Sequence, residues 1–262
     1  MPELPDVELV ARRLRRSVVR RRVTRVAIRD RSVVRSPAPR LFARRLRGRR
    51  IRTVGRRGKY LLVHLGGGLV MVGHLRMTGD FVVVPRRDPI HPHTRLVLGL
   101  GPRDIRFVDQ RRFGHVDLIA AGELETFPGL RALGVEPLTP AFSLDRLRAL
   151  IDRRRGGLKA FLLRQDLIAG IGNLYADEIL FQARLHPSRS LRNLRPAQVR
   201  ALHRSIRGAL RRGIASLSGR GRPIGDFVEA REKGGTCPRC GGPLRVATIG
   251  GRTTYYCPRC QR

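Results

Sequence analysis

Lysine and acidic residues are scarce in this chain of 262 residues, whereas arginine is abundant. There are three lysines against 52 arginines, and the 20 acidic residues leave a formal net charge of +35. Twenty of the arginines lie within residues 1–60. A GC-rich coding bias would account for part of this excess, but the size and early concentration of the charge indicate a polyanionic partner such as nucleic acid.

The scarcity of lysine singles out the lysines that remain. Arginine keeps its proton under all ordinary conditions, whereas lysine can release one, so a lysine in this background is a candidate for proton transfer. Lys59 and Lys159 are the two of interest, and Lys233 reads as a solvated charge in a glycine-rich linker.

Long apolar runs are also missing, since none reaches the roughly 18 residues that a membrane span needs. The N-terminus has no apolar core of the kind that a secretory signal requires. Binding to a membrane surface is a weaker interpretation, because no long basic helix carries a broad apolar face. These features predict a bacterial-type cytoplasmic protein.

Cysteine is confined to the last 26 residues, where Cys237 and Cys240 are separated by sixteen residues from Cys257 and Cys260. Two CxxC pairs at this spacing predict one structural Zn²⁺ held by four thiolates, and two disulfides are the alternative. Residues 243–256 between the pairs are expected to form a two-stranded ribbon. Arg252 lies near its tip, where it suits a DNA groove.

The apolar pattern predicts a β-rich domain, a sandwich or a barrel, behind a leading helix over residues 5–18. Strands are expected at 22–29, 60–65, 69–75, 81–84, 96–100, 105–108 and 115–119. From about residue 130 the pattern becomes helical, with helices at 144–151, 158–164, 173–183 and 196–214. Residues 216–235 read as a flexible connection, so we expect domains at 1–130, 131–230 and 231–262.

The N-terminus offers a reactive amine if Met1 is removed, because Pro2 then carries a secondary α-amino group. Such an amine has a pKa of about 8, below the roughly 10.4 of a lysine, and it can form an iminium with an aldehyde-like carbon. Glu3 stands beside it as a candidate acid or base. The alternative is that Pro2 merely begins a surface segment.

Three further segments carry candidate residues. Lys59 lies in a basic turn at the entrance of a predicted strand. Glycines precede Asn173, which is expected to cap a helix whose first N–H groups suit a DNA phosphate; a plain helix turn is the alternative. Met77 and Phe113 lie in basic, glycine-bearing loops, either as core residues or as wedges that enter a base stack.

Taken together, these segments resemble the formamidopyrimidine-DNA glycosylase/endonuclease VIII family over essentially the whole chain. Residues 3–5 read Glu-Leu-Pro, as in the formamidopyrimidine branch. The matching segments are residues 2–8, 58–62, 74–79, 111–114 and 170–176, together with the four cysteines. The resemblance implies an α+β multidomain protein, with an N-terminal β-sandwich, a helix–two-turn–helix domain and a C-terminal zinc finger.

The resemblance also implies roles for single residues. Pro2 would be the Schiff-base nucleophile, Glu3 the acid that helps open the sugar, Lys59 the lysine of β-elimination, and Arg252 the finger arginine linked to δ-elimination. Met77, Arg111 and Phe113 would fill the gap left by a flipped nucleotide. Further DNA contacts would come from His91, Arg111 and Arg154, with Lys159 and Asn173 on the phosphate side.

The implied function is a bifunctional DNA glycosylase/AP lyase that removes oxidised bases from duplex DNA and nicks the strand. We expect it to act as a monomer, associated with the bacterial nucleoid and not with a membrane. The alternative is an abasic-site or damaged-DNA binding protein that keeps the scaffold without excising bases. A basic RNA- or ribosome-associated zinc protein would explain the charge and cysteines but not the N-terminus.

Overall fold

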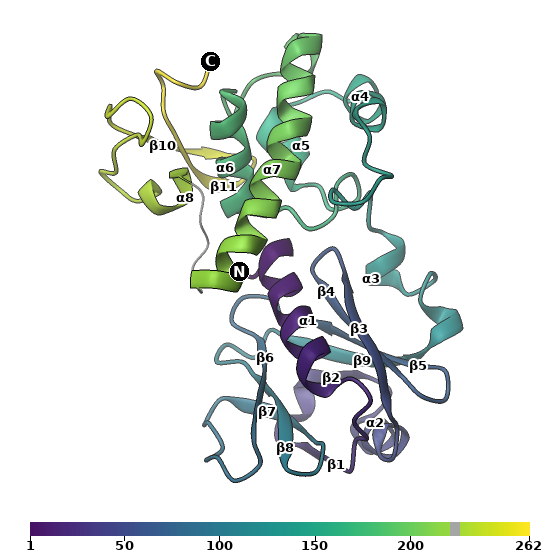
Figure 1. Cartoon of the computed structure of the whole chain (residues 1–262). Coiled ribbons are helices and arrows are strands. Elements are labelled where there is room, and N and C mark those ends of the chain that lie inside the picture. Colours follow the sequence, from purple (N-terminus) through teal and green to yellow (C-terminus); the bar gives the residue numbers. More distant parts are fainter. Residues whose placement is uncertain (221–225) are drawn as a thin grey trace. The chain divides into compact units, whose positions relative to one another are not determined.

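The computed structural model describes residues 1–220 and 226–262. The chain divides into two compact units (Figure 1). The first contains Met1–Pro2 and Asp6–Arg131, and the second contains Glu3–Pro5 and Ala132–Arg262. Helix α1 (Leu4–Val18) therefore begins in the second unit and continues in the first. Within the described ranges, no helix has both the length and the hydropathy that crossing a membrane requires.

The first unit contains two packed sheets. One sheet has the strand order β2-β9-β5-β4-β3 and the other β1-β7-β8-β6, and every pairing except the parallel β2–β9 pair is antiparallel. The strands are β1 (Arg25–Ile28), β2 (Val34–Ser36), β3 (Ile51–Arg57), β4 (Tyr60–Leu65), β5 (Leu69–His74), β6 (Asp80–Pro85), β7 (Thr94–Gly99), β8 (Arg103–Val108) and β9 (His115–Ala120). Helices α2 (Pro39–Leu46) and α3 (Pro128–Arg131) complete the unit, with short 3₁₀ turns at Arg31–Val33 and Ala121–Glu123.

One hydrophobic core joins the two sheets to α1. Val7, Ala11, Leu14 and Val18 recur at helical spacing, and all four are buried, which explains why this arginine-rich segment forms a helix that packs on one face. Further into the core, the rings of Phe81 and Phe107 lie 4.6 Å apart, in neighbouring strands of the second sheet. The predicted sandwich with a leading helix is confirmed.

The second unit is built around α6 (Asn173–Ala183). This helix is buried on nearly every side, because α5, α7, α8 and β11 pack against it. The surrounding elements are α4 (Leu144–Asp152), α5 (Leu158–Leu163), α7 (Pro196–Arg220) and α8 (Asp226–Ala230), a 3₁₀ turn at Leu191–Asn193, and the hairpin of β10 (Arg245–Ile249) and β11 (Arg252–Tyr256). The predicted helices and the finger ribbon are thus present.

The structure differs from the expectations drawn from the sequence in two respects. Residues 216–235 are not simply a flexible connection: α7 continues to Arg220, and α8 packs through Phe227, whose ring stacks on Phe181 at 4.6 Å. Residues 221–225 of that segment lie outside the described residues. The elements α2, β2 and β3 were not predicted, because arginines obscure their apolar periodicity; β3, for example, buries only Ile51 and Val54.

Candidate functional site

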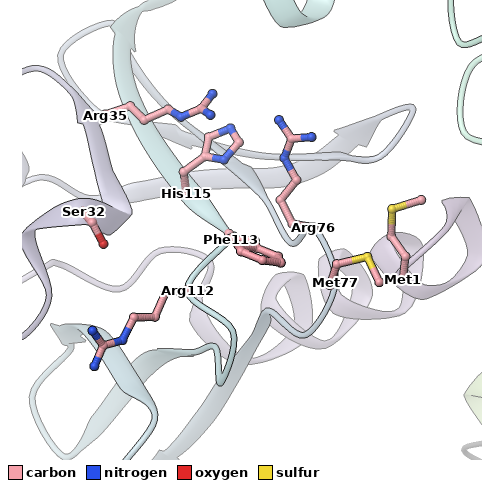
Figure 2. A pocket seen from close by; sticks show the side chains of 9 residues that line it. Met1, Ser32, Arg35, Arg76, Met77, Arg112, Phe113 and His115 are labelled. Atoms are coloured by element: carbon pink, nitrogen blue, oxygen red, sulfur yellow. The ribbon is translucent and has the colours of Figure 1, made fainter.

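A basic pocket of about 460 Å³ lies in the first unit (Figure 2). Arg35, Arg76 and Arg112 give it positive charge, and Met1, Met77 and Phe113 give it apolar surface. Met77 and Phe113 are 38% and 52% exposed, so the interpretation of these residues as parts of the core is wrong. Met1 is bonded to the nitrogen of Pro2, and removal of Met1 would therefore open space beside that nitrogen.

The loops that carry Met77 and Phe113 are joined by Asp109, a buried carboxylate. The hydroxyl of Thr78 donates to Asp109, and the backbone N–H groups of Arg111 and Gly114 donate to the same carboxylate over 3.2 and 2.7 Å. The two loops therefore form one connected surface. Asp109 and Thr78 were not predicted, because their pairing joins segments 31 residues apart.

Glycine is required where this surface meets the core. A Cβ atom on Gly114 would lie 2.5 Å from Cζ of Phe107, closer than any real contact. In the same loop, the guanidinium of Arg111 lies 4.8 Å from the centre of the Phe113 ring. Arg111 and Phe113 are therefore presented together, as the wedge interpretation requires.

Lys59 lies in the turn between β3 and β4 and is only 7% exposed. Its neighbour Tyr60 pairs with His74 across the strands, with ring centres 4.7 Å apart, and the His74 ring stacks on that of His115. Burial, reinforced by nearby positive charges, lowers the pKa of His74 to about 3 and that of His115 to about 4. Both imidazoles are thus neutral at pH 7, so His115 adds no positive charge to the pocket that it lines.

Glu3 occupies the N-terminus of α6 in the second unit. Its carboxylate accepts hydrogen bonds from the backbone N–H groups of Gly172 (2.7 Å), Leu174 (2.8 Å) and Tyr175 (3.2 Å), and the residue is 3% exposed. A Cβ atom on Gly172 would lie 2.4 Å from Cδ of Glu3, so glycine provides the room for the carboxylate. Free N–H groups at a helix start attract anions, and here Glu3 is the anion.

This arrangement corrects two expectations about the start of α6. The helix is capped at Gly172 and not at Asn173, and the N–H groups expected to hold a DNA phosphate already bind Glu3. The side-chain amide of Asn173 donates instead to the carbonyl oxygen of Thr253 in the finger, over 3.0 Å. In this structure Asn173 therefore links α6 to the finger.

Lys159 also differs from the expectation. Its side chain is fully buried, and its ammonium group pairs with the buried carboxylate of Asp177 over 2.6 Å. Burial lowers the pKa of Lys159, although Asp177 opposes that shift. The Lys159 side chain thus has no exposed surface in this structure, and its contact with a DNA phosphate stays a prediction.

Two other predicted DNA contacts lie in loops. His91 is exposed between β6 and β7, with its ring 5.2 Å from that of His93. Arg154 follows α4 and is half-buried, and its guanidinium donates to the carbonyl oxygen of Leu150 over 3.2 Å. Their contacts with DNA stay predictions.

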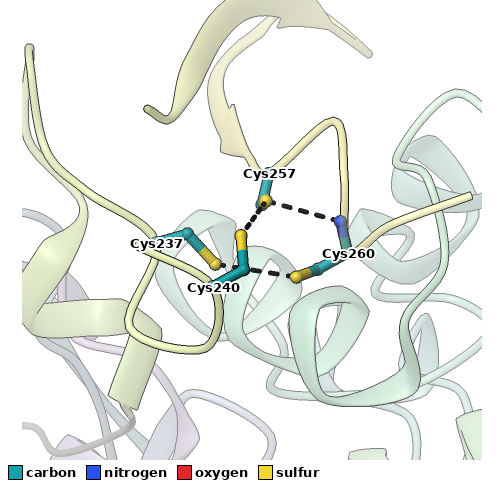
Figure 3. A group of neighbouring side chains, drawn as sticks. All are labelled: Cys237, Cys240, Cys257 and Cys260. Carbon is teal, nitrogen blue, oxygen red and sulfur yellow. Dashed lines mark hydrogen bonds between the residues drawn. The ribbon is translucent and has the colours of Figure 1, made fainter. Parts of the chain in front are cut away.

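The four cysteine sulfurs lie within 4.8 Å of one another (Figure 3). Cys237 and Cys260 have their sulfurs 3.8 Å apart, and those of Cys240 and Cys257 are 3.6 Å apart. A disulfide needs about 2.05 Å, whereas the edge of a Zn–S tetrahedron with bonds of about 2.3 Å is about 3.8 Å. The cysteines therefore fit one structural zinc ion and not disulfides, and four thiolates leave no position for a substrate.

The finger hairpin ends in a tight turn at Gly250 and Gly251, which both have positive φ. Arg252 pairs with Ile249 as the first residue after the turn, and it is exposed. The predicted position of Arg252 near the ribbon tip is confirmed.

Comparisons with known proteins agree along the whole chain. Family models match for the formamidopyrimidine-DNA glycosylase N-terminal domain (residues 1–116), the formamidopyrimidine-DNA glycosylase H2TH domain (133–221), and the zinc finger found in FPG and IleRS (234–262). The formamidopyrimidine-DNA glycosylase of Moorella thermoacetica is 45% identical over 93% of each chain. The chain belongs to the formamidopyrimidine-DNA glycosylase family.

Solved structures of the family extend the likeness to three dimensions. Lactococcus lactis formamidopyrimidine-DNA glycosylase, bound non-covalently to DNA with an AP site, has a TM-score of 0.91 at 30% identity, covering 99% of both chains. The same bacterium's protein in complex with DNA containing FAPY-dG has a TM-score of 0.91 at 29% identity, covering 99% of this chain and 100% of that one. The expected glycosylase fold is confirmed.

Loss of the zinc ion should unfold the finger of this glycosylase-family protein. We expect Cys257→Ser to lose stoichiometric zinc and to weaken DNA binding, because a four-thiolate site supplies about 10 kcal/mol or more to the folding of such a module. The first unit should keep its fold, since it has its own core. Metal analysis and DNA titration test this, with Val246→Ala, at an exposed finger position, as the control. Zinc-free protein with wild-type affinity would contradict it.

Proposed function

We propose that this protein is a bifunctional DNA glycosylase/AP lyase of base excision repair, which removes oxidised bases and nicks the strand by β,δ-elimination. One observation carries the proposal. Glu3, which directly follows Pro2, has its carboxylate fixed by three backbone N–H groups at the start of α6. A chain end held in this way places a proton acceptor beside the α-nitrogen that Met1 removal would expose. The lactococcal relatives, solved with AP-site and FAPY-dG DNA, support the substrate class.

The first reaction replaces the damaged base with the protein. The neutral nitrogen of Pro2 attacks C1′, the bond from C1′ to the base breaks, and the base leaves with the electron pair and takes a proton from water. Glu3 accepts the proton of the attacking amine and delivers it to the ring oxygen O4′. The bond between C1′ and O4′ then breaks, and the open sugar is held as an iminium on Pro2.

The iminium then permits two eliminations. Loss of a proton from C2′ expels the 3′-phosphate, and loss of a proton from C4′ expels the 5′-phosphate, because the cationic nitrogen accepts the electrons each time. We assign proton transfer in these steps to Lys59, and binding of the departing phosphate to Arg252. Hydrolysis of the iminium releases Pro2.

The remaining assignments concern the DNA. We propose that Met77, Arg111 and Phe113 enter the base stack where the damaged nucleotide has left it. The joined loops and the stacking of Arg111 on Phe113 support this assignment. The sugar–phosphate backbone of the DNA would be contacted by His91, Arg154 and the three arginines of the pocket. Such contacts contribute affinity but not sequence preference.

The organisation proposed for the chain keeps the three domains 1–130, 131–230 and 231–262. The boundaries of the family models, which fall between residues 116 and 133 and between 221 and 234, support this division. We also propose that the protein acts as a monomer in the bacterial cytoplasm, at the nucleoid where its DNA substrate lies. The bacterial origin of its relatives supports that location.

Excision from a panel of matched duplexes tests the proposed function. The panel would contain 8-oxoguanine, formamidopyrimidine, an oxidised pyrimidine, an abasic site and undamaged DNA. We expect release of at least one oxidised base, together with nicked products ending in phosphates on both sides of the gap. Tight binding to every damaged duplex without base release or nicking would instead establish the alternative of a non-excising damage-binding protein.

Lys59→Arg should reduce strand nicking of an abasic-site duplex almost as much as Lys59→Ala, by about 100-fold or more, although arginine keeps the charge. The reason is that arginine cannot release a proton, and a positioned acid or base contributes at least about 100-fold. Single-turnover rates measure the effect. Lys233→Arg is the matched control, since Lys233 is exposed and should tolerate the change. Wild-type rates in Lys59→Arg would reduce Lys59 to an electrostatic contact.

A further inference from the structure

We infer that Thr254 is a positioning residue for Arg252, and that it acts by connecting the finger to the buried Lys159–Asp177 pair. The inference rests on the role proposed above for Arg252 in phosphate binding and δ-elimination. It adds a residue that contacts neither the DNA nor the reacting atoms. All the residues concerned belong to the second unit.

The connection begins at a buried carboxylate with two cationic partners. Asp177 lies one helical turn beyond the start of α6 and is fully buried. It pairs with the ammonium of Lys159 over 2.6 Å and with Nε of Arg231 over 2.6 Å, and it also accepts a hydrogen bond from the backbone N–H of Tyr255 over 3.3 Å. A buried pair of this kind holds a defined geometry, because separating it would leave a charge without a partner.

From this pair, two hydrogen bonds lead to Arg252. Nζ of Lys159 donates to Oγ1 of Thr254 over 2.7 Å, and the same hydroxyl donates to the carbonyl oxygen of Arg252 over 2.9 Å. Thr254 is fully buried, so water does not compete for its hydroxyl. The hydroxyl has one proton and accepts as well as donates, and only Ser or Thr could make both bonds at this position with so small a side chain.

The carbonyl group of Thr253, the residue after Arg252, is also held by hydrogen bonds within the second unit. The carbonyl oxygen of Thr253 accepts from Nδ2 of Asn173 over 3.0 Å and from Nη2 of Arg231 over 3.2 Å. The turn before Arg252 also fits closely against α5, since a Cβ atom on Gly250 would lie 3.3 Å from Cα of Ala160. The backbone at Arg252 is thus fixed from α5 and α6, whereas its side chain is exposed.

Helix α6 therefore holds two groups of the proposed reaction. Its first turn binds the carboxylate of Glu3, and Asp177 on its next turn fixes the strand that begins with Arg252. Loss of the Thr254 hydroxyl would remove one hydrogen bond to the carbonyl of Arg252 without removing a zinc ligand or a contact of Glu3. The expected defect is in the phosphate-dependent step, more than in base release.

Four variants test the inference on a duplex with an abasic site: Thr254→Val, Thr254→Ser, Thr253→Val and Arg252→Ala. Valine keeps the shape of threonine without the hydroxyl, and serine restores the hydroxyl. Thr253 is the matched control because its side chain is exposed and its carbonyl survives the substitution. The readouts are the ratio of β,δ- to β-elimination products, the salt dependence of DNA affinity and the zinc content.

We expect Thr254→Val to lower the product ratio about fivefold to tenfold, as loss of a hydrogen bond worth about 1 to 1.4 kcal/mol predicts. The product ratio should shift in the same direction as it does in Arg252→Ala, and Thr254→Val should retain one zinc ion. Thr254→Ser should restore the ratio, and Thr253→Val should match wild type. Base release by Thr254→Val, measured separately on a duplex that contains an oxidised base, should change less than the product ratio.

Two results would overturn the inference alone. One is a wild-type ratio in Thr254→Val when Arg252→Ala shifts it, and the other is loss of zinc from Thr254→Val, which would make Thr254 a general support of the finger. An unchanged ratio and an unchanged salt slope in Arg252→Ala would instead refute the role proposed for Arg252. The two failures are therefore distinguishable.

Discussion

One extra residue in front of Pro2, in a form that cannot be removed, is expected to abolish nicking of DNA that contains an abasic site. The nitrogen of Pro2 would then belong to an amide, which has no available lone pair and cannot form an iminium. We expect a loss of at least about 1000-fold, or about 4 kcal/mol in activation free energy, because no step of the proposed reaction proceeds without the covalent intermediate. Rates of strand nicking under single-turnover conditions measure it.

Two controls make this result specific to the amine. The extended protein should still bind a duplex with an uncleavable abasic-site analogue, since no DNA contact is removed. Pro2→Gly, with Met1 removed, should retain measurable nicking because it keeps an α-amino group of low pKa. Wild-type nicking by the extended protein would show that another group is the nucleophile.

Glu3→Gln is expected to reduce base excision by about 100-fold or more. Glutamine has nearly the same size, but it cannot carry a proton from the attacking amine to O4′, and positioned proton transfer contributes at least about 100-fold. Its NH₂ group would also face a backbone N–H at the start of α6, where the glutamate accepts three hydrogen bonds. The free energy of unfolding should therefore fall by about 1–3 kcal/mol as well.

Rates of base release, measured below the unfolding transition, separate these two effects. Glu8→Gln is the matched control, since Glu8 lies on helix α1, which directly follows Glu3, and pairs with Arg12 and Arg56. It should alter base release little. Excision by Glu3→Gln at the wild-type rate would assign proton transfer to another residue and leave Glu3 as a helix cap.

The parts of this molecule that depend on local sequence could be predicted. The spacing of the cysteines fixes four sulfurs around one ion, and the ribbon between the pairs places Arg252 at its turn. The apolar positions of α1 recur at helical spacing despite the surrounding arginines. Each of these signals is complete within a few tens of residues.

Contacts between distant segments could not be predicted. The N–H groups at the start of α6 suggested a phosphate site, but their partner is Glu3, 169 to 172 residues away in the chain. The family resemblance placed Lys159 on the phosphate side of the DNA, whereas its buried partner Asp177 gave no sign in the sequence. Asp109 was missed for the same reason, since its role depends on the fold.

Borohydride trapping on abasic-site DNA, followed by peptide mapping of the adduct, tests the central claim most directly. Reduction converts an iminium between protein and sugar into a stable amine, so the modified residue can be identified by mass spectrometry. The account predicts one adduct, on the N-terminal peptide at the nitrogen of Pro2. An adduct on Lys59 or another lysine, or nicking that proceeds with no adduct, would contradict it.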